Sequence, residues 1–179
     1  LLILAACEHR GAPTAKQHMV AAANPLAVEA GLDILRQGGS AVDAVIATQM
    51  VLTLVEPQSS GIGGGAFLLH YKPGKSGTDR EAVIDAYDGR ETAPDSADEN
   101  LFTDTHGKTI PWRQRMAGGK GVGVPGLLRV LELSHKRHGK LPWARLFDRA
   151  IEMAVRGFSV SPRLHTMIKR DRHLKNFPA

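Results

Sequence analysis

The sequence is short of cysteine, of aromatic side chains and of long apolar runs. Its 179 residues include one cysteine, which excludes a disulfide scaffold and a zinc site built from cysteine thiolates. Aromatic residues make up 5%, and no apolar run approaches the roughly 20 residues of a membrane-spanning helix. The composition is otherwise 42% hydrophobic and 23% charged, which is typical of a globular domain and excludes collagen-like and disordered chains. The chain begins at Leu1 without methionine and stops at Ala179, so we expect a fragment.

Positive charge is concentrated in the second part of the chain. Residues 1–107 hold 7 Lys and Arg against 14 Asp and Glu, whereas residues 108–179 hold 16 against 4. A basic half can mark a nucleic-acid-binding module. Here the positive residues are scattered along helical patterns, which favours a solvated helix face or one that meets an acidic partner. We therefore expect no nucleic-acid partner, and we rank a nucleic-acid-binding module third, after an enzyme and a lipid-anchored binding protein.

The first seven residues resemble the end of a secretory signal, because an apolar run leads into small residues and Cys7. The stretch Leu4-Ala5-Ala6-Cys7 also resembles the lipobox of bacterial lipoproteins, in which the cysteine becomes the lipid-bearing N-terminus. The alternative is a short buried segment with a free cysteine. We predict a signal remnant and tether over 1–18 and a domain over 19–179, in an exported protein that is periplasmic or anchored to the membrane through Cys7.

Capping residues and periodicity predict helices on both sides of a β-hairpin. Asn24 and Pro25 are typical of a helix start, and Ser40 with Asp43 forms a near capping box for an apolar helix. The predicted helices cover residues 25–37, 41–55, 127–138, 143–155 and a segment after Ser161-Pro162; strands are predicted at 19–23, 66–71 and 82–87, and loops over 88–124. The order of helices, hairpin and helices indicates an α+β fold.

The glycine run over 61–65 matches neither a phosphate-binding loop nor a dinucleotide fingerprint, because a strand and not a helix follows it. Tight backbone packing is our first interpretation of this run, and the lining of a substrate cleft is the second. The eight histidines show no metal-ligand spacing, so we predict no metal site. There is no Gly-x-Ser-x-Gly elbow, and Cys7 falls in the tether, so we expect no catalytic nucleophile in this chain.

Arg90 directly follows the second predicted strand of the hairpin, on a loop where ligand contacts are common. A guanidinium binds a carboxylate through two parallel hydrogen bonds because its planar fork matches the two oxygens. From the residues alone, an exposed arginine paired with Asp88 or Glu91 is the more ordinary interpretation.

Five segments in order resemble the N-terminal part of the large subunit of γ-glutamyltranspeptidases, between about residues 18 and 172. They are Met-Val-Ala-Ala-Ala-Asn-Pro-Leu-Ala at 19–27, Gly-Gly-Ser-Ala-Val-Asp-Ala at 38–44, Glu-Pro at 56–57 with Ser-Gly-Ile-Gly-Gly-Gly at 60–65, Arg-Glu-Thr-Ala-Pro at 90–94 and Gly-Val-Pro-Gly at 123–126. The resemblance implies an N-terminal-nucleophile hydrolase with an αββα sandwich, of which this chain would be an incomplete part. It also implies a precursor that cuts itself into a large and a small subunit, which then form a heterodimer.

In that family, the new N-terminal threonine of the small subunit attacks γ-glutamyl amides such as glutathione, and the acyl group passes to water, an amino acid or a peptide. No cofactor is implied. Arg90 matches the arginine that binds the α-carboxylate of the γ-glutamyl group, while the catalytic threonine falls outside this chain, which we expect to be inactive alone. The alternatives are a cephalosporin-acylase-like enzyme or a poly-γ-glutamate hydrolase of the same fold, and a non-catalytic, lipid-anchored binding protein.

Overall fold

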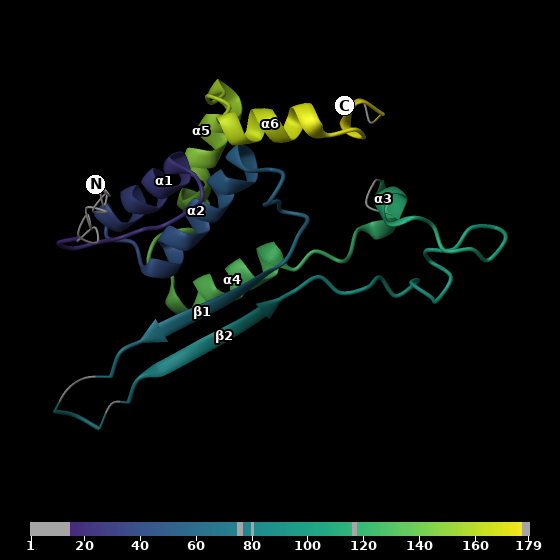
Figure 1. Ribbon diagram of the computed structural model, residues 1–179. Coiled ribbons are helices and arrows are strands. Elements are labelled where there is room, and N and C mark those ends of the chain that lie inside the picture. Colours follow the sequence, from purple (N-terminus) through teal and green to yellow (C-terminus); the bar gives the residue numbers. More distant parts are fainter. Residues whose placement is uncertain (1–14, 75–76, 80, 116–117, 177–179) are drawn as a thin grey trace, which may run out of the picture.

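The structure, a computed structural model, describes residues 15–74, 77–79, 81–115 and 118–176. The helices and strands are α1 (Pro25–Arg36), α2 (Ala41–Val55), β1 (Ala66–Lys72), β2 (Val83–Gly89), α3 (Trp112–Arg115), α4 (Leu127–His138), α5 (Asp148–Arg156) and α6 (Pro162–Arg170). Strands β1 and β2 pair antiparallel, and α4 lies along one face of this hairpin, with α2 and α1 stacked beyond it (Figure 1). The α+β class and the hairpin between helices are confirmed.

Helix starts follow the capping residues that the sequence offers. The Asn24 side chain accepts a hydrogen bond from the Leu26 amide at the start of α1. At the start of α2, Ser40 and Asp43 form a complete capping box, in which each side chain accepts a hydrogen bond from the other residue's backbone N–H. The Ser161 side chain caps α6 by accepting a hydrogen bond from the Leu164 amide.

Two predicted elements differ in the structure. Residues 19–23 do not form a strand, because this alanine-rich segment has little strand propensity and lies beside helices rather than beside the hairpin. The helix predicted from Trp143 starts as a 3₁₀ helix over Trp143–Phe147, and α5 begins only at Asp148. Pro142 is the N-cap residue of this 3₁₀ helix and offers no side-chain hydrogen bond, while its carbonyl accepts from the Arg145 N–H in a 3₁₀-type bond.

Helix α2 lies at the centre of the core, which explains why it is apolar on all sides. It packs against α1 and also contacts α4, α5 and the 3₁₀ helix over Trp143–Phe147. Buried side chains such as Ile46, Val51 and Leu146 fill the space between these elements. Among the described residues, no helix is both long and apolar enough to cross a membrane.

Glu56 joins the ends of three helices and starts the segment that leads to the glycine run. Its buried carboxylate accepts hydrogen bonds from Asn24 Nδ2 at 3.2 Å and Gln58 Nε2 at 2.6 Å, and it also pairs with Arg163 of α6. These hydrogen bonds, with the one from Asn24 the strongest, hold the pKa of the Glu56 carboxyl below its usual value. The segment after α2 is therefore fixed in place before it reaches β1.

Candidate functional site

Arg90 lies immediately after β2 with its side chain directed to solvent. Its backbone N–H donates to Asp88 Oδ1 at 2.9 Å, so Asp88 shapes the turn at the strand end. The side chain is 72% exposed, and its nearest carboxylate oxygen, Glu91 Oε2, lies 3.8 Å from Nε. Within the part of the chain that the structure describes, the guanidinium makes no hydrogen bond, so its fork is available to a ligand.

Three glycines bring the backbone together beneath Arg90. A Cβ atom on Gly126 would lie 2.2 Å from the Gly89 carbonyl oxygen, and one on Gly65 would lie 2.5 Å from the same oxygen. A Cβ atom on Gly89 itself would lie 2.6 Å from Val130 Cβ. The start of β1, the end of β2 and the start of α4 therefore meet at distances that no side chain would permit. The predicted tight packing of the glycine run is confirmed at Gly65, its last member.

Hydrogen bonds join the loop after Arg90 to the segment before α4, and that segment to the glycine run. Val124 N–H donates to the Thr92 carbonyl at 2.9 Å, and Gly126 and Leu127 both donate to the Gly64 carbonyl, at 3.2 and 3.0 Å. The loop that carries Arg90 is therefore bonded on one side to a segment that is itself anchored to the glycine run. Three of the five segments that resemble γ-glutamyltranspeptidases lie side by side here, namely residues 60–65, 90–94 and 123–126.

An open pocket of about 360 Å³ lies beside this junction. Its lining is formed by residues 90–94, Leu101, Phe102 and residues 120–123. Arg90 and Lys120 place two positive charges on the pocket wall and Glu91 places one negative charge there, which leaves a net positive charge suited to a small anionic group. The structure thus brings Arg90 to a pocket. No residue of the glycine run over 61–65 is among those that line it, so this pocket does not support the second interpretation of that run.

Substituting Gly126 by alanine is expected to lower the free energy of unfolding by about 2–3 kcal/mol, because the new methyl group must push the Gly89 backbone away. Gly119→Ala is the matched control, since a Cβ atom there meets open space, and it is expected to stay within about 0.5 kcal/mol of the parent. Urea unfolding of the full-length protein measures both. Equal stabilities of the two variants would contradict the described contact between Gly89 and Gly126.

Comparison with known proteins identifies the family of the chain. A family model described as gamma-glutamyltranspeptidase matches residues 27–179. The chain belongs to the γ-glutamyltranspeptidase family. It is 40% identical over 153 residues to the glutathione hydrolase proenzyme of Bacillus subtilis strain 168, a match covering 86% of this chain and 25% of the relative. The glutathione hydrolase proenzyme of Pseudomonas aeruginosa is 37% identical over 89% of this chain and 27% of its own length. The chain thus spans about a quarter of these relatives.

Solved structures show the same relationship. The γ-glutamyltranspeptidase of Helicobacter pylori matches with a TM-score of 0.82 and 32% identity over 93% of this chain and 46% of that one. The cephalosporin acylase of Bacillus halodurans matches with a TM-score of 0.71 and 32% identity over 95% of this chain and 32% of that one. The chain therefore has, in part, the α+β fold of the N-terminal-nucleophile hydrolases.

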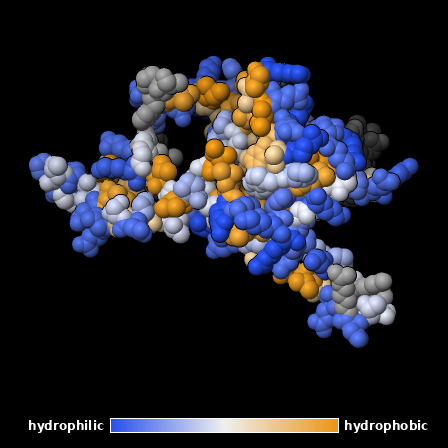
Figure 2. Space-filling view, turned by 180° about the vertical axis from the view of Figure 1, so that it is seen from behind, coloured by the Kyte–Doolittle hydropathy of each residue, from blue (hydrophilic) through white to orange (hydrophobic). Residues whose placement is uncertain are grey.

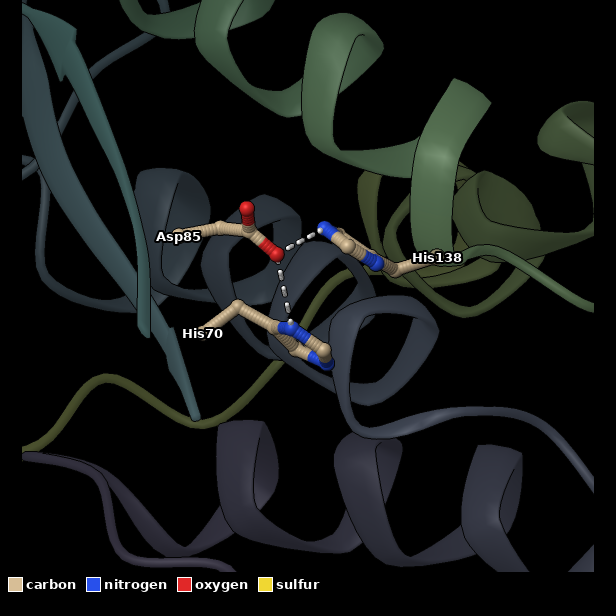
Figure 3. A group of neighbouring side chains, drawn as sticks. All are labelled: His70, Asp85 and His138. Carbon is tan, nitrogen blue, oxygen red and sulfur yellow. Dashed lines mark ion pairs between the residues drawn. The ribbon is translucent and has the colours of Figure 1, made fainter. Parts of the chain in front are cut away.

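The structure of this family member also brings together His70, Asp85 and His138, which sequence spacing did not connect (Figure 3). His70 and Asp85 are opposite each other in the hairpin, and His138 is the last residue of α4. Burial, and next the proximity of His70, lowers the pKa of His138. The sequence predicted no metal site because only the spacing of histidines within single segments was considered, and these three residues come from separate elements. The signal that could have linked the first two residues is the register of the hairpin.

Proposed function

We propose that this chain forms part of the large subunit of a γ-glutamyltranspeptidase that cleaves γ-glutamyl amides such as glutathione and transfers the acyl group to water, amino acids or peptides. The observation that carries the proposal is the exposed Arg90 guanidinium, held on a glycine-packed backbone beside a 360 Å³ pocket, in a chain of this family. The B. subtilis and P. aeruginosa relatives, both named glutathione hydrolase proenzymes, support the same activity.

Arg90 would bind and orient the acyl group. Its guanidinium can donate two parallel hydrogen bonds to the α-carboxylate of the γ-glutamyl group. The contacts among Gly65, Gly89 and Gly126 fix the backbone from which the side chain extends, so little movement is needed on binding. The chain thereby holds one end of the substrate while the amide carbonyl, at the other end, faces the nucleophile.

The nucleophile in this proposal is the N-terminal threonine of the small subunit. Its hydroxyl oxygen attacks the amide carbonyl carbon while its own α-amine accepts the hydroxyl proton. The C–N bond then breaks, the leaving amine takes that proton, and a γ-glutamyl ester of the threonine remains. Water or an amino group attacks this ester and restores the free hydroxyl. The described residues contribute binding and orientation to these steps.

The exposed apolar face of the hairpin is an argument for a second polypeptide as partner. Apolar side chains on the hairpin face opposite α4 are exposed, with Leu69 at 74%; the others are Phe67, Tyr71 and Ile84. Apolar side chains (orange) also reach the surface on both arms that project from the helices (Figure 2). An αββα sandwich covers this face of the hairpin with a second sheet, which we assign in part to the small subunit of the same precursor.

Expression of the full-length protein tests this function. We expect the precursor to appear as two polypeptides, the smaller beginning with threonine, and to release the amine from a γ-glutamyl anilide. Intact-mass measurement identifies the cleavage site and absorbance follows the amine. A protein that stays as one chain and leaves the anilide intact would contradict the proposal.

A cephalosporin-type acylase is the second candidate, because the B. halodurans enzyme matches 95% of this chain. Arg90 does not separate the two functions when the acyl group of the substrate also carries a carboxylate. The same preparation separates them, since a γ-glutamyltranspeptidase cleaves the γ-glutamyl anilide faster than a cephalosporin side chain and an acylase does the reverse.

We further propose that residues 1–18 are a leader remnant and tether ahead of the domain over 19–179, and that the protein is exported and lipid-anchored through Cys7. The proposal rests on the stretch Leu4-Ala5-Ala6-Cys7, and residues 1–14 lie outside the described part of the chain. Mass spectrometry of the native N-terminal peptide tests it. A peptide that retains residues 1–6, from protein found in the cytoplasmic fraction, would reject it.

A further inference from the structure

We propose that His70, Asp85 and His138 form a binding site for a divalent transition-metal ion of the zinc type. The three side chains converge from the hairpin and from α4, with His70 Nδ1 and His138 Nε2 both directed toward Asp85 Oδ2 (Figure 3). The site uses none of the residues of the Arg90 pocket and does not depend on the proposed γ-glutamyl activity.

The fold assembles this group without help from local sequence. In the hairpin register His70 pairs with Asp85, two residues along from the pair Leu68 and Tyr87, so all four side chains share the face that packs against α4. His138 ends α4 above this face, and its Nε2 lies 2.8 Å from the Tyr87 hydroxyl. Asp85 lies four residues before the end of β2, about 13 Å along the strand from the Arg90 loop.

The distances are close to those of a bound ion. Zinc binds imidazole nitrogen and carboxylate oxygen at about 2.0–2.2 Å, so tetrahedral donor atoms lie about 3.3 Å apart. Asp85 Oδ2 lies 3.4 Å from His138 Nε2 and 3.8 Å from His70 Nδ1, and the donor atoms of the group all lie within 4.8 Å of one another. The pair of Asp85 and His138 is already close to this spacing, whereas the pair of Asp85 and His70 must contract by about 0.5 Å and the two histidine nitrogens by at most about 1.5 Å.

The surroundings of His70 Nδ1 favour a bound ion or water. It is buried and forms no hydrogen bond among the described residues, although Asp85 lies nearby. Buried polar atoms are nearly always satisfied, so such an atom calls for a water or an ion. A metal ion between the three donors would satisfy His70 Nδ1, while the Tyr87 hydroxyl could supply a fourth ligand or bind a metal-held water.

The donor set selects the class of ion. Two imidazole nitrogens and one carboxylate suit zinc and its neighbours, whereas calcium and magnesium require mostly oxygen ligands. Lys72 and Arg137 are positive charges near His138 that oppose any cation, so binding depends on the strong bonds that ions of the zinc type form with imidazole nitrogen. The imidazole rings of His70 and His138 are stacked, with centroids 3.9 Å apart and planes at 18°, and ion binding is expected to open this stack.

Calorimetric titration of the full-length, chelator-treated protein with Zn²⁺ tests the site. We expect one equivalent to bind with a dissociation constant of micromolar or lower and the variants His70→Ala and Asp85→Asn to weaken binding at least 100-fold. His165→Ala, which removes an exposed histidine of α6, is the matched control and is expected to leave binding unchanged. Substituting Co²⁺ and recording its visible absorption reports the coordination directly.

Melting curves recorded without metal show whether each variant is folded. Asp85→Asn preserves the shape of the side chain and keeps the test valid if His70→Ala unfolds. Binding that is absent from the parent protein, or that is equally tight in the parent and in the folded Asp85→Asn variant, would overturn the proposal.

Discussion

Replacing Arg90 by alanine in the full-length enzyme is expected to reduce kcat/KM for γ-glutamyl donors by about 100-fold, mainly through a higher KM. The variant loses two charge-assisted hydrogen bonds to the carboxylate, and bonds of that kind contribute about 1.5–3 kcal/mol each. A 100-fold change corresponds to about 2.8 kcal/mol, which this loss can supply. Because Arg90 makes these hydrogen bonds both with the bound substrate and with the transition state, KM changes more than kcat. Steady-state kinetics with a γ-glutamyl anilide measures the effect.

Two further variants show whether the fork of Arg90 and not its charge alone is required. Arg90→Lys keeps the charge but loses the bidentate geometry, so we expect an intermediate loss. Arg172→Ala removes an exposed arginine elsewhere and is expected to change nothing. All three variants should still cleave themselves into two subunits. An unchanged KM in Arg90→Ala would contradict the assigned role.

Replacing Asp43 by alanine is expected to lower the free energy of unfolding by about 3–5 kcal/mol. Asp43 is fully buried, and its Oδ2 accepts backbone N–H groups from Ser40 at 2.8 Å, Lys140 at 2.9 Å and Leu141 at 3.1 Å. His135 Nε2 lies 3.5 Å from Oδ1. The carboxylate therefore ties the start of α2 to the chain that follows α4, and its removal leaves three partly buried backbone N–H groups without this acceptor.

Ser40→Ala is the matched control because it removes the other half of the same capping box. It is expected to lower the free energy of unfolding by about 1 kcal/mol, the usual effect of losing a helix cap. Urea unfolding of the full-length protein compares the two variants. An Asp43→Ala protein no less stable than Ser40→Ala would show that the bonds to Lys140 and Leu141 contribute nothing.

Much of the fold could be predicted from local signals, because its helices begin at residues whose side chains cap them. Asn24, Ser40 and Ser161 each accept the expected backbone hydrogen bond, and α4 has the predicted bounds. The failures have tertiary causes. Residues 19–23 lack a neighbouring strand with which to pair, and the turn after Pro142 is tightened to a 3₁₀ helix that buries Leu146.

In the candidate site, too, some residues could be predicted from the sequence and others depend on tertiary packing. Arg90 could be identified because a whole segment, Arg-Glu-Thr-Ala-Pro, resembles a known family. The contact between Gly89 and Gly126 could not be predicted, because the position of a glycine in the sequence does not indicate which other backbone segment packs against it. Asp43 was predicted as a capping residue, yet its bonds to Lys140 and Leu141 depend on how α4 packs. His70, Asp85 and His138 meet only through the hairpin register and the end of α4.

We propose above that Arg90 holds the α-carboxylate of a γ-glutamyl group. A crystal structure of the full-length, processed protein with bound glutamate would show this contact. We expect both carboxylate oxygens within about 3 Å of the Arg90 guanidinium nitrogens, beside the pocket formed by residues 90–94 and 120–123. Glutamate bound with its α-carboxylate on other residues, and Arg90 still directed to solvent, would contradict it.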